Sequence, residues 1–214
     1  MSDVLQIVHL DAACLVAVKP AGLLAVPGRG EHLQDCLAAR VQAQYADALV
    51  VHRLDMATSG LMLFARGADA QRRLSRAFAP REVHKRYVAV VQGHIVLAEG
   101  TVGEIDLPLL ADWPNRPLQK VDRVLGKPSL TRYRVLAFDA ENGTTRVELE
   151  PISGRTHQLR VHLLAIGHPI LGDRLYAPAE VQAASDRLLL HATQLAFAHP
   201  VSGAPIEVES PVPF

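Results

Sequence analysis

The alternation of apolar and polar residues along the chain predicts many short strands. Residues 5–18 have the pattern of two strands around a polar turn at Asp11, and turn-forming residues follow over 19–30. Further strands are predicted at 87–91, 101–109, 130–138, 145–151, 188–198 and 206–209. The sequence Glu141-Asn142-Gly143 lies between two of them and indicates a hairpin.

Three segments have helical spacing instead. In residues 33–45, Leu33, Leu37, Val41 and Tyr45 recur every four positions and predict one buried stripe. Residues 68–78 predict a second helix that Pro80 closes, and residues 156–166 a third that Gly167 caps. The prolines within 112–117 predict an irregular loop. Hairpins of strands with few helices indicate an α+β fold on a largely antiparallel sheet.

The composition is that of a compact globular protein. Of 214 residues, 49% are hydrophobic and 21% charged, so we expect a single domain over 1–214 with a sizeable core. The sequence contains neither a secretion signal nor an apolar run near the roughly 18 residues of a membrane helix, which predicts a cytoplasmic protein. Cys14 and Cys36 are interpreted as reduced thiols, with no disulfide or zinc role.

The charge is neutral in sum but uneven along the chain. The 22 basic and 22 acidic residues cancel, whereas a protein that binds RNA is usually basic. Residues 51–90 nevertheless hold eight Arg and Lys against three Asp and Glu, and residues 112–134 hold six against two. These segments predict a basic face able to attract a polyanion, and chance clustering on solvated surfaces is the alternative.

The segment 51–65 is the strongest candidate for chemistry. A polar loop, His52-Arg53-Leu54-Asp55, runs through Thr58-Ser59-Gly60 into an apolar strand, and loops anchored in this way often hold catalytic groups. From the residues alone, a turn residue or the partner in a surface ion pair is the favoured explanation of Asp55.

The motifs of this chain resemble those of the RluA-type pseudouridine synthases almost from end to end. The resemblance rests on His-Arg-Leu-Asp, two further residues and Thr-Ser-Gly, a long and specific signature. Further matching segments are Lys19-Pro20-Ala21-Gly22-Leu23, Lys85-Arg86-Tyr87-Val88-Ala89, Gly154-Arg155-Thr156-His157-Gln158, Gly167-His168-Pro169 and Leu188-Leu189-Leu190-His191.

The resemblance implies a pseudouridine synthase fold, with a central, mostly antiparallel mixed sheet, flanking helices and loops, and no N-terminal S4 domain. It implies that Asp55 is the catalytic carboxylate, that Arg155 pairs with it, and that Tyr87 stacks on the flipped uracil. Arg53 then helps to displace the base, and an apolar residue among Leu188–Leu190 lines the pocket, of which we select Leu190. His52, Trp113 and Arg116, with the arginines of 68–78, are our own candidates for holding RNA.

The implied reaction is isomerisation of uridine to pseudouridine, which requires no cofactor. The motif Asp112-Trp113-Pro114-Asn115-Arg116-Pro117 resembles the members that act on 23S rRNA and on the anticodon loop of certain tRNAs. We therefore expect RNA as the partner, a monomer and no obligatory protein partner. The alternatives are the same chemistry on another rRNA or tRNA uridine, and a catalytically silent RNA-binding module.

A metal site among the histidines is disfavoured. His157 and His162 are five residues apart, so a helix would separate them by roughly 140° rather than place them on one face. Phosphate-loop and nucleophile-elbow motifs are also absent from the sequence. These observations exclude the common hydrolase and nucleotide-hydrolysing classes.

Overall fold

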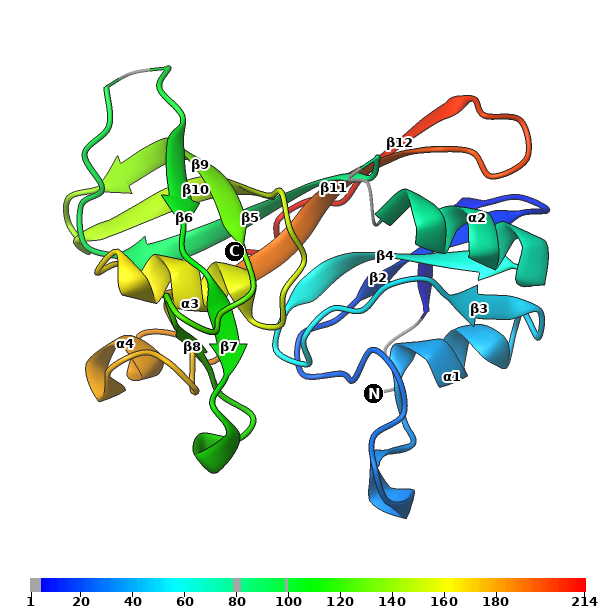
Figure 1. The fold of residues 1–214 in the computed structure, drawn as a ribbon, viewed down its shortest axis with the longest axis horizontal. Coiled ribbons are helices and arrows are strands. Elements are labelled where there is room, and N and C mark those ends of the chain that lie inside the picture. The colour runs from blue at the N-terminus through cyan, green and yellow to red at the C-terminus, as the bar shows by residue number, and fades with distance from the viewer. Residues whose placement is uncertain (1–4, 79–81, 99) are drawn as a thin grey trace. The chain divides into compact units, whose positions relative to one another are not determined.

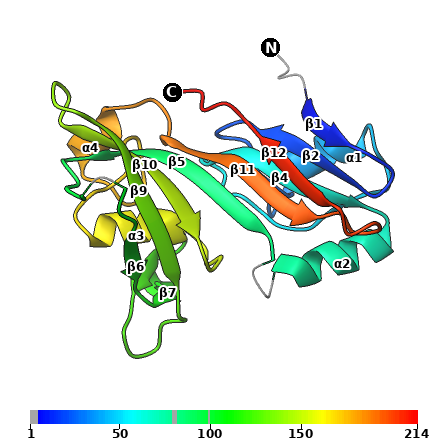
Figure 2. The same cartoon turned by 90° about the horizontal axis from the view of Figure 1, so that it is seen from above.

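The computed structural model describes residues 5–78, 82–98 and 100–214, and these form two compact units. The first unit comprises Met1–Lys85 and Ala192–Pro213, and the second comprises Arg86–His191 with Phe214. The boundaries between the units fall within the strands β5 (His84–Gln92) and β11 (Leu190–Ala198). Figure 1 and Figure 2 show the ribbon from two directions.

The first unit is built on a sheet in which β1, β2, β4 and β11 are neighbours. β1 (Gln6–Leu10), β2 (Cys14–Lys19) and β4 (Ser59–Arg66) pair antiparallel, as do β3 (Ala48–Val50) with β4 and β12 (Pro205–Glu209) with β11. Nearly every residue of β2 and β4 is buried. Because successive side chains of a strand point to opposite faces, such a pattern requires that both faces be covered.

Two helices cover these faces, as Figure 1 shows. One cluster joins Ala70 and Leu74 of α2 (Ala68–Phe78) to Cys14, Val16, Leu61, Leu63 and Ala65. The other joins Leu37, Ala38 and Val41 of α1 (Leu37–Gln42) to the alternate strand residues Leu15, Ala17, Met62 and Phe64. The continuous apolar runs of the two central strands therefore fill two cores.

The first predicted helix is wrong at its start. α1 begins at Leu37 because the Cys36 side chain accepts a hydrogen bond from the Ala39 N–H at 3.3 Å and caps the helix there. Leu33 instead ends a short 3-10 turn, η1 (Glu31–Leu33), and is 37% exposed. The second helix, α2, has the bounds that the spacing predicts. Pro80, its expected stop signal, lies outside the described residues.

The second unit contains a meander of antiparallel strands in the order β5, β10 (Thr144–Pro151), β9 (Leu130–Asp139) and β6 (Gly103–Asp106). The predicted hairpin between β9 and β10 is confirmed. The predicted strand 101–109 is confirmed only over Gly103–Asp106, because the chain changes partner after β6: β7 (Leu109–Ala111) pairs with β8 (Gln119–Val121) in a separate ribbon. Pro108 lies at this break and has no N–H to donate to a ladder.

The remaining helices of the second unit are short. α3 (Gln158–Ala165) starts later than predicted because His157 has a left-handed φ of 54°, which a helix does not continue through. The predicted cap at Gly167 is confirmed by hydrogen bonds from Gly167 N to Leu164 O and from His168 N to Leu163 O.

The sequence pattern of apolar and polar residues predicted neither the helix α4 (Ala179–Ala183) nor the 3-10 turn η2 (Trp113–Asn115), which lies inside the predicted loop. None of the helices in the described ranges is long and apolar enough to cross a membrane.

Candidate active site

Asp55 lies in the loop 51–58, which connects β3 to β4 in the first unit. The loop is partly buried at Asp55 and exposed at Arg53, and it enters β4 through Thr58 and Ser59, which are almost completely buried. Thr58 N donates to the Asp55 carbonyl oxygen at 3.1 Å. A polar turn is thus fixed at the end of a rigid strand, as expected from the sequence.

The buried side chain of Lys19 anchors this loop through hydrogen bonds to its backbone and to that of the preceding turn. Its side chain is 0% exposed, and its Nζ donates to the carbonyl oxygens of Pro20, Leu23 and Met56 at 2.8, 2.7 and 2.9 Å. The Met56 oxygen also accepts from Gly22 N at 2.9 Å. An ammonium group has three donors, so these three carbonyls use all of them. The carbonyl next to Asp55 is therefore anchored to the end of β2.

His52 holds the start of the same loop. Its Nε2 accepts a hydrogen bond from Leu63 N at 3.0 Å, and its ring stacks on Phe78 with centroids 4.8 Å apart. Burial, and then the positive charge of Lys85, lower the pKa of His52 to about 3. The ring is therefore neutral near pH 7 and ties the loop to β4. Its predicted part in binding RNA stays a prediction.

Tyr87 and Arg155 belong to the second unit. Tyr87 is on β5, opposite Leu149 of β10. Arg155 is exposed and lies between the end of β10 and the start of α3, where its Nε donates to Pro128 O at 3.4 Å. The sequence correctly placed Arg155 at the entrance to a helix, and its guanidinium is held at one point by a backbone carbonyl.

Gln158 fixes the backbone at Arg155. This side chain is 4% exposed, and its Oε1 accepts from Arg155 N at 3.0 Å and from Ser153 Oγ at 2.8 Å. Its Nε2 donates to Leu130 O and to Thr131 Oγ1, both at 3.0 Å. The amide thereby ties the turn before α3 to the first residues of β9.

A second set of polar contacts supports the same turn. His157 Nδ1 is hydrogen-bonded to the Tyr176 hydroxyl at 2.6 Å, and that oxygen accepts from Gln119 N at 2.9 Å. Arg160 forms a buried two-bond ion pair with Asp173, at 2.8 and 2.6 Å, and its guanidinium lies 5.0 Å from the Tyr176 ring centroid. These contacts hold His157 in its left-handed conformation.

The sequence did not identify Lys19 or Gln158 as site residues. Both lie within segments that carried the family resemblance, but no local pattern reveals their partners. One signal was present for Lys19, because a lysine that ends an otherwise apolar strand requires acceptors if it is buried. For Gln158 there was none, since its partners on β9 lie 27 and 28 residues away.

His162, the other member of the disfavoured metal pair, has both ring nitrogens occupied. Nδ1 is hydrogen-bonded to Thr131 Oγ1 and Nε2 to Leu107 O, each at 2.9 Å. Burial is the largest influence on the ring, and it lowers the pKa of His162. The side chain joins α3 to the strand edge and has no nitrogen to offer a metal.

The remaining predicted site residues also lie in the second unit. Trp113 and Arg116 lie in the connection between β7 and β8, where Trp113 is 67% exposed and the Arg116 guanidinium lies 3.0 Å from its ring centroid. Leu190 is buried at the start of β11. Their predicted contacts with RNA stay predictions.

The structure thus gathers His52, Arg53 and Asp55 on one loop of the first unit. Tyr87, Arg155, Leu190, Trp113 and Arg116 lie in the second. That Asp55, Tyr87 and Arg155 act on the same uridine stays a prediction.

Comparison with known proteins gives one consistent result. Residues 13–165 match the RNA pseudouridylate synthase family. The chain is 52% identical over 210 residues to a protein of Escherichia coli (strain K12) named dual-specificity RNA pseudouridine synthase RluA, covering 98% of this chain and 94% of that protein. The protein of the same name from Yersinia pestis is 49% identical over 208 residues, covering 97% and 99%.

Solved structures agree. The chain superposes on human RNA pseudouridylate synthase domain containing 1 with a TM-score of 0.80 at 30% identity, covering 98% of this chain and 84% of that one. For human RNA pseudouridylate synthase domain containing 4 the TM-score is 0.74 at 25% identity, covering 97% and 88%. These matches confirm the predicted α+β pseudouridine synthase fold.

Proposed function

This chain belongs to the RNA pseudouridylate synthase family, and from that premise we propose that it isomerises uridine in both 23S rRNA and the anticodon loop of certain tRNAs. The observation that carries the proposal is the 52% identity, over 98% of this chain, to a relative named as a dual-specificity RNA pseudouridine synthase.

Asp55 performs the covalent step. In the reaction the bond between N1 and C1′ breaks and a bond between C5 and C1′ forms, while the proton on C5 is lost and N1 gains one. The products balance without an oxidant, a reductant or an external group. A carboxylate serves because it can attack C1′ of the ribose or C6 of the ring, or stabilise the departing uracil.

Arg155 maintains the charge that Asp55 requires. Removing a carboxylate from water favours its neutral form, and a nearby guanidinium favours the ionised form. Arginine suits the role because its planar fork can pair with both carboxylate oxygens. The hydrogen bonds that fix the backbone of Arg155 through Gln158 support this assignment.

Arg53 and Tyr87 bring the base to Asp55. A stacked uridine cannot present its glycosidic bond, so the base must leave the stack at a cost of a few kcal/mol. Stacking on an aromatic ring such as Tyr87 returns about 1–3 kcal/mol. Arg53 is exposed on the same loop as Asp55, and this position supports its role in displacing the base. Leu190 provides apolar lining.

We assign the contacts that hold the rest of the RNA to exposed cationic and aromatic groups, which are Trp113, Arg116 and the arginines Arg72, Arg73 and Arg76 of α2. His52, whose neutral ring is tied to β4, acts on the RNA through the position of its loop. Arg73 also donates to Pro200 O at 2.8 Å, which orients its guanidinium on the helix.

The protein works on this proposal as a cytoplasmic monomer, without an obligatory protein partner and without a metal or organic cofactor in the reaction. Activity should therefore survive exhaustive chelation, once any effect of Mg²⁺ on folding of the RNA is corrected. A loss of activity that added metal restores on a short, unstructured substrate would contradict this.

Mapping pseudouridine after incubation with unmodified 23S rRNA and tRNA transcripts tests the function. The proposal expects product in both RNAs, and product at another uridine alone would establish the alternative target. Asp55→Asn should bind RNA with unchanged affinity and form no product. Asp35→Asn, an exposed carboxylate that pairs with Arg40, is the matched control and should retain activity. Turnover by Asp55→Asn would refute the mechanism, and wild-type binding without product on any RNA would indicate the silent module.

A further inference from the structure

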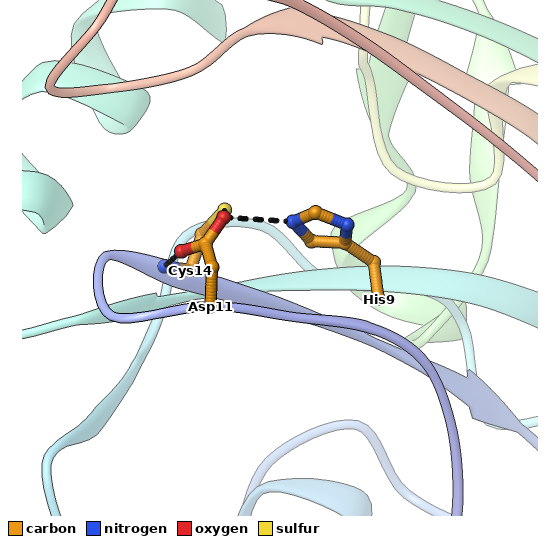
Figure 3. A group of neighbouring side chains, drawn as sticks. All are labelled: His9, Asp11 and Cys14. Atoms are coloured by element: carbon orange, nitrogen blue, oxygen red, sulfur yellow. Dashed lines mark hydrogen bonds and ion pairs between the residues drawn. The ribbon is translucent and has the colours of Figure 1, made fainter.

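Three potential metal ligands converge where β1 turns into β2. His9 Nε2 lies 2.9 Å from Asp11 Oδ2, and Cys14 Sγ lies 3.7 Å from the same oxygen. The three atoms all lie within 4.8 Å of one another, and Figure 3 shows the side chains directed toward a common point. None of these residues has a part in the proposed pseudouridine chemistry.

The turn holds Asp11 in position independently of the other two side chains. Its Oδ1 accepts from Ala13 N at 2.7 Å and from Cys14 N at 2.8 Å, and Asp11 N donates to Cys14 O at 3.0 Å. These bonds complete a turn of the Asx type. Stabilising the hairpin therefore uses one carboxylate oxygen and leaves the other directed at His9 and Cys14.

The sequence predicts no zinc role for Cys14, but from this geometry we propose that His9, Asp11 and Cys14 bind one Zn²⁺ ion, or a divalent transition metal of similar preference. Zinc takes imidazole nitrogen, thiolate sulfur and carboxylate oxygen in tetrahedral geometry, with bonds of about 2.0–2.3 Å. Ligand atoms around such an ion are about 3.3–3.8 Å apart. The distances from Asp11 Oδ2 to His9 Nε2 and to Cys14 Sγ, 2.9 and 3.7 Å, lie near this range, and the group as a whole must contract from the 4.8 Å within which its atoms lie. Asp11 and Cys14 as anions balance the charge of the ion, and a water takes the fourth position.

His199 supports this site without being a ligand. Its Nδ1 accepts from Val201 N at 3.3 Å and from Ser202 N at 3.0 Å, so the ring proton is on Nε2. That Nε2 lies 3.4 Å from Asp11 Oδ2. A nitrogen that carries a proton cannot bind a metal, but it can orient a metal-binding carboxylate.

The surroundings permit entry of an ion. The side chains of His9 and Asp11 are 26% and 32% exposed, whereas Cys14 is buried in the core below α2. Arg66 donates to the Asp11 carbonyl oxygen at 3.0 Å, and its charge is balanced by an ion pair with Asp47. The site is thus open to solvent on its imidazole and carboxylate side and closed on its sulfur side.

A redox role for Cys14 is a weaker explanation of the same cluster. Burial and the adjacent Asp11 carboxylate raise the pKa of the Cys14 thiol to about 12, so without a metal it has little thiolate near pH 7, and a bound ion must displace the thiol proton. Its sulfur is also completely inaccessible to solvent. Both properties make the thiol a poor nucleophile.

Titration of the reduced, tag-free, chelator-stripped chain with Co²⁺ tests the proposal. Cobalt substitutes for zinc and absorbs in the near ultraviolet when a thiolate binds it. We expect this absorption to saturate at one cobalt per chain, to disappear on addition of Zn²⁺, and to be lost in Cys14→Ser. His9→Gln should weaken cobalt binding at least tenfold. His199→Gln should retain the absorption.

Two matched controls separate this site from others on the chain. Cys36→Ser removes the other buried thiol, and His32→Gln removes an exposed histidine; both should bind cobalt as the wild type does. Zinc should also raise the melting temperature of the wild type and not of His9→Gln, because an ion that binds only the folded state stabilises it.

Absence of the thiolate absorption in the wild type would overturn the proposal, as would its persistence in Cys14→Ser. If Cys14→Ser does not fold, as judged by circular dichroism, His9→Gln decides the result. Cobalt binding by this partly exposed variant with wild-type affinity would also overturn the proposal.

Discussion

The side-chain amide oxygen of Gln158 accepts a hydrogen bond from the backbone N–H of Arg155 at 3.0 Å. The same amide donates to Leu130 O and Thr131 Oγ1 on β9. One buried side chain therefore fixes the position of a predicted catalytic arginine relative to the sheet of its own unit. A contact of this kind acts on the reaction through Arg155 and does not require that Gln158 touch the uridine.

Gln158→Leu should lower kcat at least tenfold and change KM for RNA by less than about threefold. The hydrogen bonds at Arg155 N and Leu130 O lose their partner, which costs about 1–3 kcal/mol for each buried group left unsatisfied. Kinetics of the folded variant at low temperature, with urea unfolding alongside, measure both effects. Gln182→Leu, which loses one amide bond to Ala177 O, is the control. A stability loss with unchanged kcat would limit Gln158 to a structural role.

Lys19→Met should destabilise the protein and reduce turnover together. Methionine retains the length of the side chain but donates to none of the three carbonyls, and each acceptor left unpaired costs about 1–3 kcal/mol. The Met56 carbonyl would keep its bond from Gly22 N but lose the one from Lys19, which should also loosen the backbone at Asp55. Urea unfolding and single-turnover kinetics measure these effects. The exposed Lys127→Met should leave the unfolding midpoint unchanged, and a Lys19→Met enzyme with full activity would show that the loop does not need this anchor.

Gly60→Ala should destabilise the first unit strongly. Gly60 has φ of +116°, and an added Cβ would lie 2.3 Å from Ala192 O and 2.5 Å from Ala192 N. These are backbone atoms of the neighbouring strand, so neither can rotate away. We expect a loss of about 3 kcal/mol or more, by comparison with overpacked cores.

Gly67→Ala provides the control for this substitution. Gly67 also has a positive φ, of +84°, but no atom lies within 4 Å of its added Cβ. It should cost only the backbone strain, about 1–2 kcal/mol. Denaturant unfolding of both variants compares their losses in the free energy of unfolding. Equal losses would show that backbone strain alone, without the clash at Ala192, explains the effect of Gly60→Ala.

Acidification should lower the free energy of unfolding between about pH 6.5 and pH 4, the range set by the histidine pKa values. Burial and Lys85 lower the pKa of His52 to about 3, and burial and Arg187 lower that of His191 to about 4, from 6.5. In this window the unfolded chain binds protons that the folded chain does not, so stability falls as pH falls. Each histidine contributes up to about 1.4 kcal/mol per pH unit.

Urea unfolding of His52→Gln at pH 5 and pH 7 measures how much His52 contributes to this loss of stability on acidification. The glutamine can still accept from Leu63 N but takes up no proton, so the difference in stability between the two pH values should shrink by up to about 2 kcal/mol. The exposed His32→Gln should keep the full difference. An unchanged pH dependence in His52→Gln would show that its ring is protonated in the folded state.

The success of the sequence predictions depended on whether the determining contacts were local. The bounds of α2 and the cap at Gly167 follow from residues within one turn and were correct. The predicted start of α1 was wrong because Cys36, an unusual capping residue, sets the first residue of the helix at Leu37. The apolar spacing that extends back to Leu33 does not show this cap. The break at Pro108 was missed because apolar residues continue on both sides of it.

The same distinction applies to the residues of the proposed catalytic loop. The run from His52 to Asp55 is a long, local motif, so the sequence alone was enough to propose this loop. Lys19 and Gln158 were not identified, since hydrogen bonds between distant segments leave no periodic pattern. The ring of His52 accepts a hydrogen bond from Leu63, and the sequence alone suggested only a contact with RNA.

Trp113→Ala should weaken binding of an RNA stem-loop about tenfold and leave kcat unchanged. The ring is 67% exposed and stacks against the Arg116 guanidinium at 3.0 Å, so it presents a flat, positively charged surface beside the β7–β8 ribbon. An aromatic contact with a base is worth about 1–3 kcal/mol, which matches that loss. Arg116→Lys keeps the charge but not the planar stack, so its loss of affinity should lie between wild type and Trp113→Ala.

Filter binding over a range of salt concentrations separates stacking from charge. Neutralising a phosphate contact reduces the slope of log affinity against log salt by about 0.7–0.9, whereas losing a stacked base leaves the slope unchanged. Trp113→Ala should therefore keep the wild-type slope, and Arg116→Ala should reduce it. Leu125→Ala removes an apolar side chain that is 72% exposed in the turn after β8, and it should bind as wild type does. Equal affinities for Trp113→Ala and Leu125→Ala would exclude the Trp113–Arg116 stack from the RNA contact.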